Sequence, residues 1–409
     1  MISVYIEDKV RTEIREPGMK KVIFLEWDSF GNQYIKKELE NRNYEVICFP
    51  FAYQKEDTRR NEDLAVRITS KILETSPEFV FSFNFFPVAA IACKACRIPY
   101  LSWTYDCPFI QIYSRTIEYD TNYAFVFDYS EYLRLSRLAP GRIFYLPMAA
   151  PVETYDRMVP DNRWKRYKVD VAMIGSMYTE GKHQIFKHLE KADEYTKGYL
   201  DALMLAQKGL YGCNVLEGAL TEDIMNRIRK VCPIVSNGDG LETAEWAFAN
   251  YYLARKVTAM ERQEVLENLS KHYDVALYTP EPTPLLPKVR NLGQVDYYTE
   301  APYAMKMAKI NLNVTLRSIG SGIPLRAMDI MGCGAFLMTN YQSDFLEYFT
   351  PDEDYVYYED IADLIEKTGY YLSHEEERIR IAKNGYHKVK EAHTYRKRVD
   401  QMLVAAGIS

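Results

Sequence analysis

The sequence predicts an α/β protein in which two successive doubly wound domains face a central cleft. Three observations predict this fold class. Short apolar runs alternate with amphipathic runs, which is typical of parallel strands covered by helices on both faces. The alternation stops in a polar segment at 150–168, which contains Pro151 and Pro160, and then starts again. A chain of 409 residues with 47% hydrophobic composition can also fill two cores.

The first half of the chain shows the alternation in its simplest form. Buried strands are expected at 20–27, 44–51, 77–85, 98–106, 123–128 and 142–149. Helices are expected between them, at 28–43 after a short loop, 64–76, 86–97 and 130–139. Residues 1–155 are therefore expected to form a first domain.

The second half repeats the pattern around a long helical stretch. Strands are expected at 169–176, 273–279, 289–298, 309–316, 335–340 and 354–360. Residues from about 181 to 271 have helical periodicity almost throughout. We expect a second domain at 165–385 with this stretch as an insertion. Residues 386–409 are expected to form a C-terminal helix that can pack back on the first domain.

The composition excludes several classes of protein. A net charge of −6 argues against a nucleic-acid partner. Residues 1–21 are charged and lack the apolar run of a signal peptide, and no run reaches the roughly 18 apolar residues of a membrane span. The seven cysteines are scattered and odd in number, as is typical of reduced thiols. We expect a cytoplasmic protein with no integral membrane segment.

No metal site is expected. The six histidines form no pair with metal-ligand spacing. Cys93 and Cys96 have no second ligand pair and are expected to pack in a core. The acidic run at 352–354 lies in a polar loop and is interpreted as a solvated turn.

The stretch "NVTLRSIGSGIPLRAMDIMGCGAFLMTN" (313–340) holds most of the candidate chemistry. A strand ends near Arg317, a loop follows at 318–322, and Pro324 stands where a helix would begin. A loop before a helix N-terminus offers free backbone N–H groups and the positive end of a dipole, both of which favour phosphate. Arg317 and Arg326 could add charge-assisted contacts to a diphosphate.

Asp329 lies on the second turn of that predicted helix. A carboxylate accepts hydrogen bonds from two adjacent hydroxyls, so it suits a ribose diol. It could equally pair with Arg326, three residues earlier on the same helix face. The residues alone leave both readings open.

Residues 325–334, "LRAMDIMGCG", resemble the signature of GT-B glycosyltransferases, with Asp329 at the position of an acidic residue that binds the nucleotide ribose. The segment 336–403 is similar to the end of the spore maturation protein CgeB-like glycosyltransferases. "YLSWTYDCPF" (100–109) and "LPMAAP" (146–151) resemble the N-terminal domain of such proteins. The resemblance implies two Rossmann-like domains and a metal-independent reaction of a nucleotide-diphosphate sugar, UDP- or dTDP-linked.

The resemblance also implies a donor site in the second domain. Backbone N–H groups at Gly175 and Ser176 would lie near the diphosphate, with His183 close to the same loop in sequence. The remaining donor-binding candidates are Thr279, Val295, Tyr297, Arg317, Ser318, Gly320, Ser321, Gly322, Arg326 and Asp329. Arg326 would also help to stabilise the leaving diphosphate. Many retaining members carry a first glutamate where this chain has Ser321. Whether the reaction retains or inverts the configuration at the anomeric carbon therefore stays open.

The acceptor would bind the first domain. Asp28 and Gly31 follow the first predicted strand, and Trp103 and Tyr105 could form an apolar wall. Asp106 ends a strand and could act as the general base that takes the proton of the acceptor hydroxyl. Its alternative role is to cap a loop.

The function that these expectations favour is transfer of a sugar from a nucleotide-diphosphate donor to a hydroxyl of a protein or glycan. Two alternatives stay open. One is a sugar-nucleotide epimerase of the same fold. The other is a non-catalytic glycan-binding or scaffold protein, to which the missing acid at Ser321 lends weight.

Overall fold

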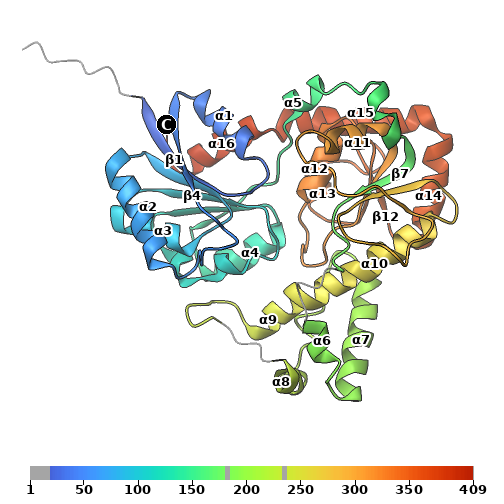
Figure 1. The fold of residues 1–409 in the computed structure, drawn as a ribbon, viewed down its shortest axis with the longest axis horizontal. Coiled ribbons are helices and arrows are strands. Elements are labelled where there is room, and N and C mark those ends of the chain that lie inside the picture. Colours follow the sequence, from blue (N-terminus) through green and yellow to red (C-terminus); the bar gives the residue numbers. More distant parts are fainter. Residues whose placement is uncertain (1–18, 180–184, 233–236, 409) are drawn as a thin grey trace, which may run out of the picture.

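The computed structural model describes residues 19–179, 185–232 and 237–408. They form two α/β domains side by side, with a group of helices projecting below them (Figure 1). No helix in the described part of the chain is long and apolar enough to cross a membrane.

The first domain is built on a six-stranded parallel sheet. In spatial order the strands are β2 (Tyr44–Pro50), β1 (Lys20–Glu26), β3 (Phe79–Phe83), β4 (Tyr100–Thr104), β5 (Asn122–Val126) and β6 (Ile143–Tyr145). Helix α1 (Asn32–Glu40) packs on the face that carries Val22 and Phe24. Helices α2 (Glu62–Thr75), α3 (Pro87–Cys96) and α4 (Tyr129–Leu138) pack on the other face. Both faces are covered, which is why these strands are apolar at successive positions.

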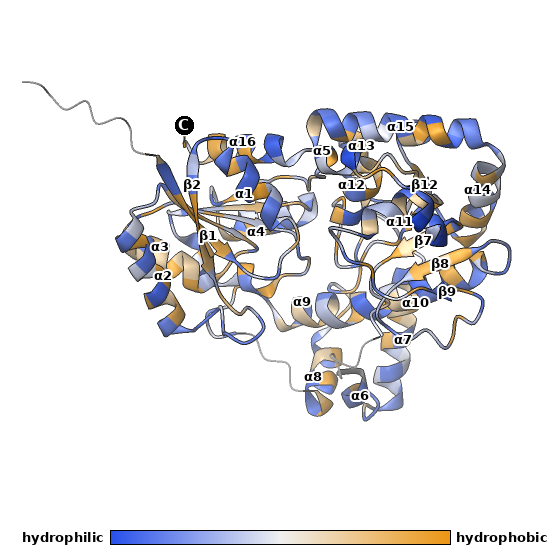
Figure 2. Ribbon diagram, turned by 45° about the horizontal axis from the view of Figure 1, so that its top comes forward, coloured by the Kyte–Doolittle hydropathy of each residue, from blue (hydrophilic) through white to orange (hydrophobic). Residues whose placement is uncertain are grey.

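The second domain repeats this architecture. Its parallel strands are ordered β12 (Val356–Tyr358), β11 (Leu337–Asn340), β10 (Ala308–Asn313), β7 (Val169–Ile174), β8 (Val275–Tyr278) and β9 (Arg290–Asn291). One face carries α10 (Ala254–Leu269), α14 (Ile361–Ser373) and α15 (Glu375–Ala392). The other carries α11 (Ala301–Met307) and α12 (Leu325–Gly332), and a short α13 (Phe345–Tyr348) follows β11. Figure 2 shows β7 and β8 as largely hydrophobic and the helices as alternately hydrophobic and hydrophilic. The predicted fold class is confirmed.

Between β7 and α10 the described elements are all helical. They are α6 (Ile185–Leu189), α7 (Glu194–Lys208), α8 (Glu222–Val231) and α9 (Ala244–Phe248), and α9 runs through one π-helical turn (Ala249–Leu253) into α10. The C-terminal half of α10 packs on the sheet of the second domain through Val265, Leu266 and Leu269. The helices before α10 and the first turns of α10 form a separate hydrophobic cluster. The insertion therefore ends before residue 271.

The loop before α9 reaches the first domain (Figure 1, yellow). The backbone N–H of Leu241 donates to the Tyr113 carbonyl at 2.7 Å, and Asp239 forms an ion pair with Arg59 at 3.0 Å. The rings of Trp246 and Tyr113 lie 4.2 Å apart. These contacts tie the insertion to the first domain.

Several predicted boundaries are corrected. The strand expected at 289–298 is limited to the two residues of β9, because Gly293 turns the chain with φ +78°. The segment 150–168 contains α5 (Val152–Arg157). The helix expected at 386–409 is two helices, α15 and α16 (Tyr395–Ala405), which are separated at His393 and Thr394.

Helix α16 lies on the first domain, where Tyr395, Val399 and Met402 join the core against α1. The chain therefore crosses between the domains twice, and the crossings run together: the Ala150 N–H donates to the His393 carbonyl at 2.9 Å. Buried Arg398 donates to the carbonyls of Pro147 and Met148, at 2.6 and 3.2 Å.

Candidate functional site

The carboxyl edges of the two sheets face each other. After β4, the Cys107 carbonyl accepts a hydrogen bond from Ser318 Oγ, in the loop after β10, at 3.0 Å. After β1, the Gly31 N–H donates at 3.0 Å to the hydroxyl of Tyr298, which follows β9. Open α/β sheets bind ligands at this edge, so a site is expected at the junction of the domains.

The loop 318–322 is held by a carboxylate of the first domain. Asp128, which follows β5, is 2% exposed and accepts hydrogen bonds from the backbone N–H groups of Gly320 (2.7 Å) and Ser321 (3.1 Å). It also accepts from the hydroxyls of Ser321 (2.8 Å) and Ser130 (2.7 Å) and from the Ser130 N–H (3.0 Å). The N–H groups predicted to bind a phosphate thus bind an internal anion.

The glycines of this loop are explained by the same contact. A Cβ on Gly322 would lie 2.8 Å from Asp128 Cα, and one on Gly320 would lie 2.2 Å from Ser130 Oγ. Close approach of the first domain therefore requires both glycines. Ser318, Gly320, Ser321 and Gly322 lie together in one loop, as predicted. The loop packs against the first domain.

Asp329 is 1% exposed on α12 and is surrounded by tyrosines. Tyr155 donates a hydrogen bond to its Oδ1 at 2.8 Å and Tyr297 donates to the same oxygen at 3.4 Å. Burial raises the pKa of Asp329 to about 7, against the lowering effect of these hydrogen bonds. The expected alternative, an ion pair with Arg326, is not formed among the described residues. No described donor bonds Oδ2.

Two arginines that form no ion pair with a described carboxylate lie beside the loop that follows β7. Arg326 donates to Asn313 Oδ1 at 3.0 Å, and a Cβ on Gly175 would lie 2.5 Å from its Nη2, so this glycine makes room for the guanidinium. Arg262 is 1% exposed and donates to the carbonyls of Val314 and Ser176. Among the described residues neither arginine forms an ion pair. Burial, and next the charge of Arg262, lower the pKa of Arg326 to about 10.

The β7 loop also holds an internal carboxylate. Glu281, after β8, accepts hydrogen bonds from the backbone N–H groups of Met177 (2.6 Å) and Thr179 (2.8 Å) and from the Ser176 hydroxyl. Burial raises the pKa of Glu281, but these hydrogen bonds outweigh it and lower the pKa to about 2. Thr279 and Val295 are buried nearby in the second domain. His183 lies outside the described residues.

Arg317 does not reach the loop 318–322. Its Nε pairs with Glu261 at 2.8 Å, and its other nitrogens donate to the carbonyls of Leu210 and Lys208 at 2.8 and 2.9 Å. The guanidinium also lies over the Tyr211 ring at 4.1 Å. Its place is inside the second domain, where it ties α7 and α10 to the end of β10.

Asp106 is exposed where the loop after β4 meets the second domain. Asn84 donates to its Oδ2 at 2.7 Å and so orients the carboxylate. Desolvation by the surrounding protein raises the pKa of Asp106, while the hydrogen bond from Asn84 and the charge of Arg255 lower it. A solvent-accessible carboxylate with a raised pKa is suited to proton transfer.

The predicted acceptor residues separate into two groups. Asp28 is exposed and Tyr105 is half-buried, so both can meet a ligand. Trp103 is 0% exposed and packs against Phe83, with its Nε1 donating to the Leu146 carbonyl at 3.3 Å. Its prediction as an acceptor wall is corrected, because that face of β4 is covered by α16. Gly31 has φ +91°, and a Cβ there would lie 2.6 Å from the Tyr395 hydroxyl, so packing requires this glycine.

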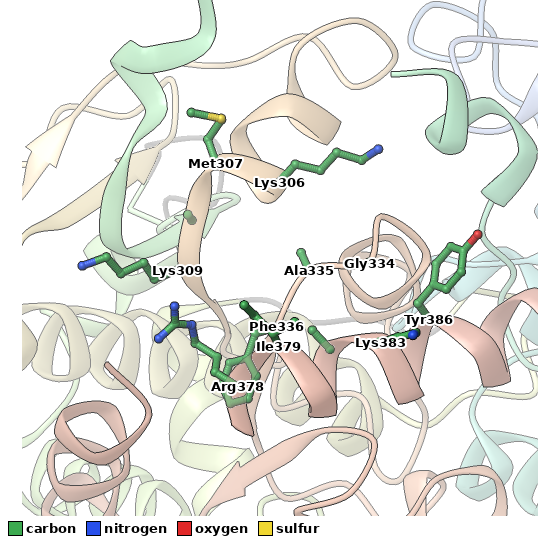
Figure 3. A pocket seen from close by; sticks show the side chains of 12 residues that line it. Lys306, Met307, Lys309, Gly334, Ala335, Phe336, Arg378, Ile379, Lys383 and Tyr386 are labelled. Carbon is green, nitrogen blue, oxygen red and sulfur yellow. The ribbon is translucent and has the colours of Figure 1, made fainter. Parts of the chain in front are cut away.

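Three of the hollows on the surface of the described structure lie at the ends of sheet strands. One of 720 Å³ adjoins the carboxyl ends of β7 and β8 and is lined by Ser176, Met177, Gln263 and the segment 280–286. One of 910 Å³ lies at the carboxyl ends of β1 and β2. The third, of 530 Å³, lies at the opposite ends of the second domain's strands, beside α15 (Figure 3). Its Lys306 and Lys309 are already bonded, to the Met158 carbonyl and to Asp170, so it is not part of the site.

Arg262, Asp128 and Glu281 were missed by sequence reasoning. Asp128 ends one predicted strand and Glu281 closely follows another, which is the available signal for a residue at the carboxyl edge. Nothing in the spacing of Arg262 within α10 distinguishes it from a surface arginine.

Two doubly wound parallel sheets that meet at their carboxyl edges define the GT-B fold, and solved structures share it. A glycosyltransferase from Rickettsia africae aligns over 96% of this chain and 100% of its own, with TM-score 0.52 and 10% identity. Sucrose-phosphate synthase from Thermosynechococcus elongatus aligns over 94% and 97%, with TM-score 0.54 and 10% identity. Anabaena HepE, solved with UDP and glucose, aligns over 95% and 99%, with TM-score 0.54 and 9% identity.

In sequence, residues 256–404 match the model of the family described as Glycosyl transferase-like. The match spans a little over a third of the chain and includes α12 with Arg326 and Asp329. No curated protein matches the chain in sequence.

Proposed function

We propose that the protein is a glycosyltransferase that moves a sugar from a nucleoside-diphosphate donor to a hydroxyl acceptor. The observation that carries the proposal is the pair Arg262 and Arg326, which lie at the carboxyl edge of β7 and β10 and form no ion pair with a described carboxylate. Charges withdrawn from water without a counter-ion are unfavourable, and a diphosphate would supply the missing anion. The family match and the shared fold support the same conclusion.

Each part of the donor has a candidate contact. The diphosphate would lie against Arg326, Arg262 and the β7 loop, and the ribose hydroxyls would bind Oδ2 of Asp329. The nucleobase would lie in the hollow beside 280–286. The arginines would stabilise the charge that develops on the leaving diphosphate, with no metal ion required.

Asp106 would take the proton of the acceptor hydroxyl. The oxygen then attacks the anomeric carbon, the bond from that carbon to the diphosphate oxygen breaks, and the nucleoside diphosphate leaves with the electron pair. The raised pKa of Asp106 improves its strength as a base once it is ionised.

Finer features of the proposal rest on the sequence. The donor would be UDP- or dTDP-linked, and the chain would belong to the CgeB-like branch, on the strength of the segments 100–109 and 336–403. HepE, which shares the fold, was solved with UDP-glucose, which favours UDP. All seven cysteines are free thiols, which fits a reducing cytoplasm.

The proposal is tested by titrating UDP, dTDP, GDP and their sugars into the protein and into Arg326→Ala, with calorimetry as the readout. We expect at least one nucleoside diphosphate to bind the wild type and to bind the variant at least tenfold more weakly. Arg317→Lys, which changes a guanidinium away from the site, is the matched control. Absence of nucleotide binding in the wild type would contradict the proposal and favour a scaffold role.

A further inference from the structure

The hollow of 910 Å³ at the carboxyl ends of β1 and β2 is lined mainly by the first domain. Its lining includes Trp27, Phe30, Phe51 and Tyr53, and the second domain contributes Tyr298. The Tyr298 hydroxyl donates to the Ser29 carbonyl at 3.3 Å and accepts from the Gly31 N–H. The hollow is therefore complete only when the two domains are together. Its volume lies at the upper end of the range for small-molecule sites, about 300–1,000 Å³.

Aromatic rings line the hollow and continue beyond it to Tyr105. The Trp27 ring lies 4.7 Å from Tyr53 and 6.2 Å from Tyr105, nearly parallel to the latter at 15°. Trp27 is fixed by a hydrogen bond of 3.0 Å from its Nε1 to the Phe83 carbonyl. All three rings are only partly buried. Rigid, half-exposed rings present flat apolar faces to a ligand at little entropic cost.

The rim of the hollow carries polar side chains with no partner in the described structure. Asp28, Gln54 and Lys55 are exposed, and their side chains form no hydrogen bond or ion pair with described residues. Together they offer an acceptor, an amide and a donor. A ligand that suits this hollow has a flat apolar face and many hydroxyls around its edge.

The hollow adjoins the candidate base. Tyr105, whose ring is stacked with Trp27, immediately precedes Asp106. The charge of Asp106 also acts on Tyr53: burial, and next that charge, raise the pKa of Tyr53 to about 12. A ligand on Trp27 would therefore have one end near the Asp106 carboxylate.

We propose that this hollow binds a carbohydrate acceptor, with a sugar ring stacked on Trp27 and its reactive hydroxyl directed to Asp106. The role of the reactive hydroxyl rests on the proposed function. The binding of a carbohydrate in the hollow does not depend on it. A carbohydrate combines an apolar C–H face with edge hydroxyls, which matches the wall and the rim. A peptide bound as an added strand fits less well, because the edge strand β2 ends at Pro50, which has no N–H to pair.

The test has a binding arm and a transfer arm. The donor-free protein is applied to an array of bacterial glycans and Ser/Thr-containing peptides, and hits are measured by calorimetry. We expect glycans to bind, Trp27→Ala to weaken binding at least tenfold, and Lys55→Ala to weaken it several-fold. Lys55 is exposed and its side chain forms no hydrogen bond or ion pair with described residues, so its variant should fold normally. Trp164→Phe, on a tryptophan stacked on Tyr303 in the second domain, is the matched control and should bind as the wild type does.

In the transfer arm, Trp27→Ala should lower kcat/KM for the acceptor at least tenfold while donor hydrolysis stays within twofold of the wild type. Binding to peptides alone, to neither class, or equally to wild type and Trp27→Ala would overturn the inference. Glycan binding that depends on Trp27, without any donor turnover, would defeat the proposed transferase and leave the assignment of the hollow intact.

Discussion

Replacing Asp128 by asparagine should open the junction between the two domains. In the wild type the Asp128 carboxylate accepts from the Gly320 N–H at 2.7 Å and from the Ser321 N–H and hydroxyl, all on the opposite domain. Asparagine keeps one acceptor oxygen. If that oxygen stays with Ser321 and Ser130, its amide NH₂ group faces the Gly320 N–H, and two donors oppose each other.

The magnitude follows from the contacts. A hydrogen bond to a charged group contributes about 1.5–3 kcal/mol, and a buried donor left without an acceptor costs about 1–3 kcal/mol. Loss of the Gly320 bond should therefore destabilise the closed arrangement by about 2–4 kcal/mol. Since about 1.4 kcal/mol is a factor of ten in an equilibrium constant, the ratio of closed to open molecules should fall roughly 30- to 1,000-fold.

Small-angle X-ray scattering measures the outcome. Asp128→Asn should have a larger radius of gyration than the wild type in the absence of ligand. Glu131→Gln is the control, because Glu131 accepts its hydrogen bond from Tyr113 of its own domain at 2.9 Å. Scattering curves of Asp128→Asn and wild type that superimpose would refute the reasoning that this carboxylate holds the domains together.

Three further predictions concern the site. Arg326→Ala should weaken nucleoside-diphosphate binding at least tenfold by calorimetry, and unchanged affinity would place the diphosphate elsewhere. Asp106→Asn should lower the transfer rate about 10²–10⁴-fold with donor affinity unchanged, and a variant that transfers at the wild-type rate would exclude the residue as the base. The folded-state pKa of Asp329, about 7, lies above its ordinary value of 3.8, so the folded protein holds this proton more tightly and stability falls as pH rises from about 4 to about 7. Asp329→Asn should therefore melt several degrees above the wild type at pH 8, with the difference shrinking at pH 5, and an equal difference at both pH values would contradict the assignment.

The alternation of apolar and helical runs was sufficient to predict both sheets, because strands such as Val22–Leu25 and Val169–Ile174 are buried on both faces. For the same reason, the sequence does not show which face of the sheet Trp103 lies on. When both faces are covered, a strand has no polar side to mark the outside, and only the position of α16 decides which side chains are sealed. The two-residue β9 could not be anticipated either, since its apolar neighbours continue beyond the point where Gly293 turns the chain.

For the candidate site, local sequence placed Asp329 and Arg326 on one helix and the loop 318–322 before it. It could not pair residues that are far apart in the chain. Asp128 accepts from Ser321, 193 positions further along the chain, and Glu261 forms an ion pair with Arg317, whereas Arg326 forms none with a described residue. Which arginine meets a carboxylate depends on the packing of α10 against β10. That packing is a tertiary property with no local signature.

The position of α16 has a consequence for how the protein is made. The first domain is translated first, yet one face of its sheet, with Val22 and Phe24, is covered in part by the 11 residues of α16, which follow the whole second domain. Domains generally fold as units during synthesis, N-terminal ones first. Until Tyr395–Ala405 is synthesised, the part of this apolar face that α1 does not cover stays exposed on the nascent chain. A nascent chain of this protein should therefore be a substrate for chaperones that bind exposed hydrophobic surface, and a product cut before α16 should aggregate even though all six strands of its first sheet are present.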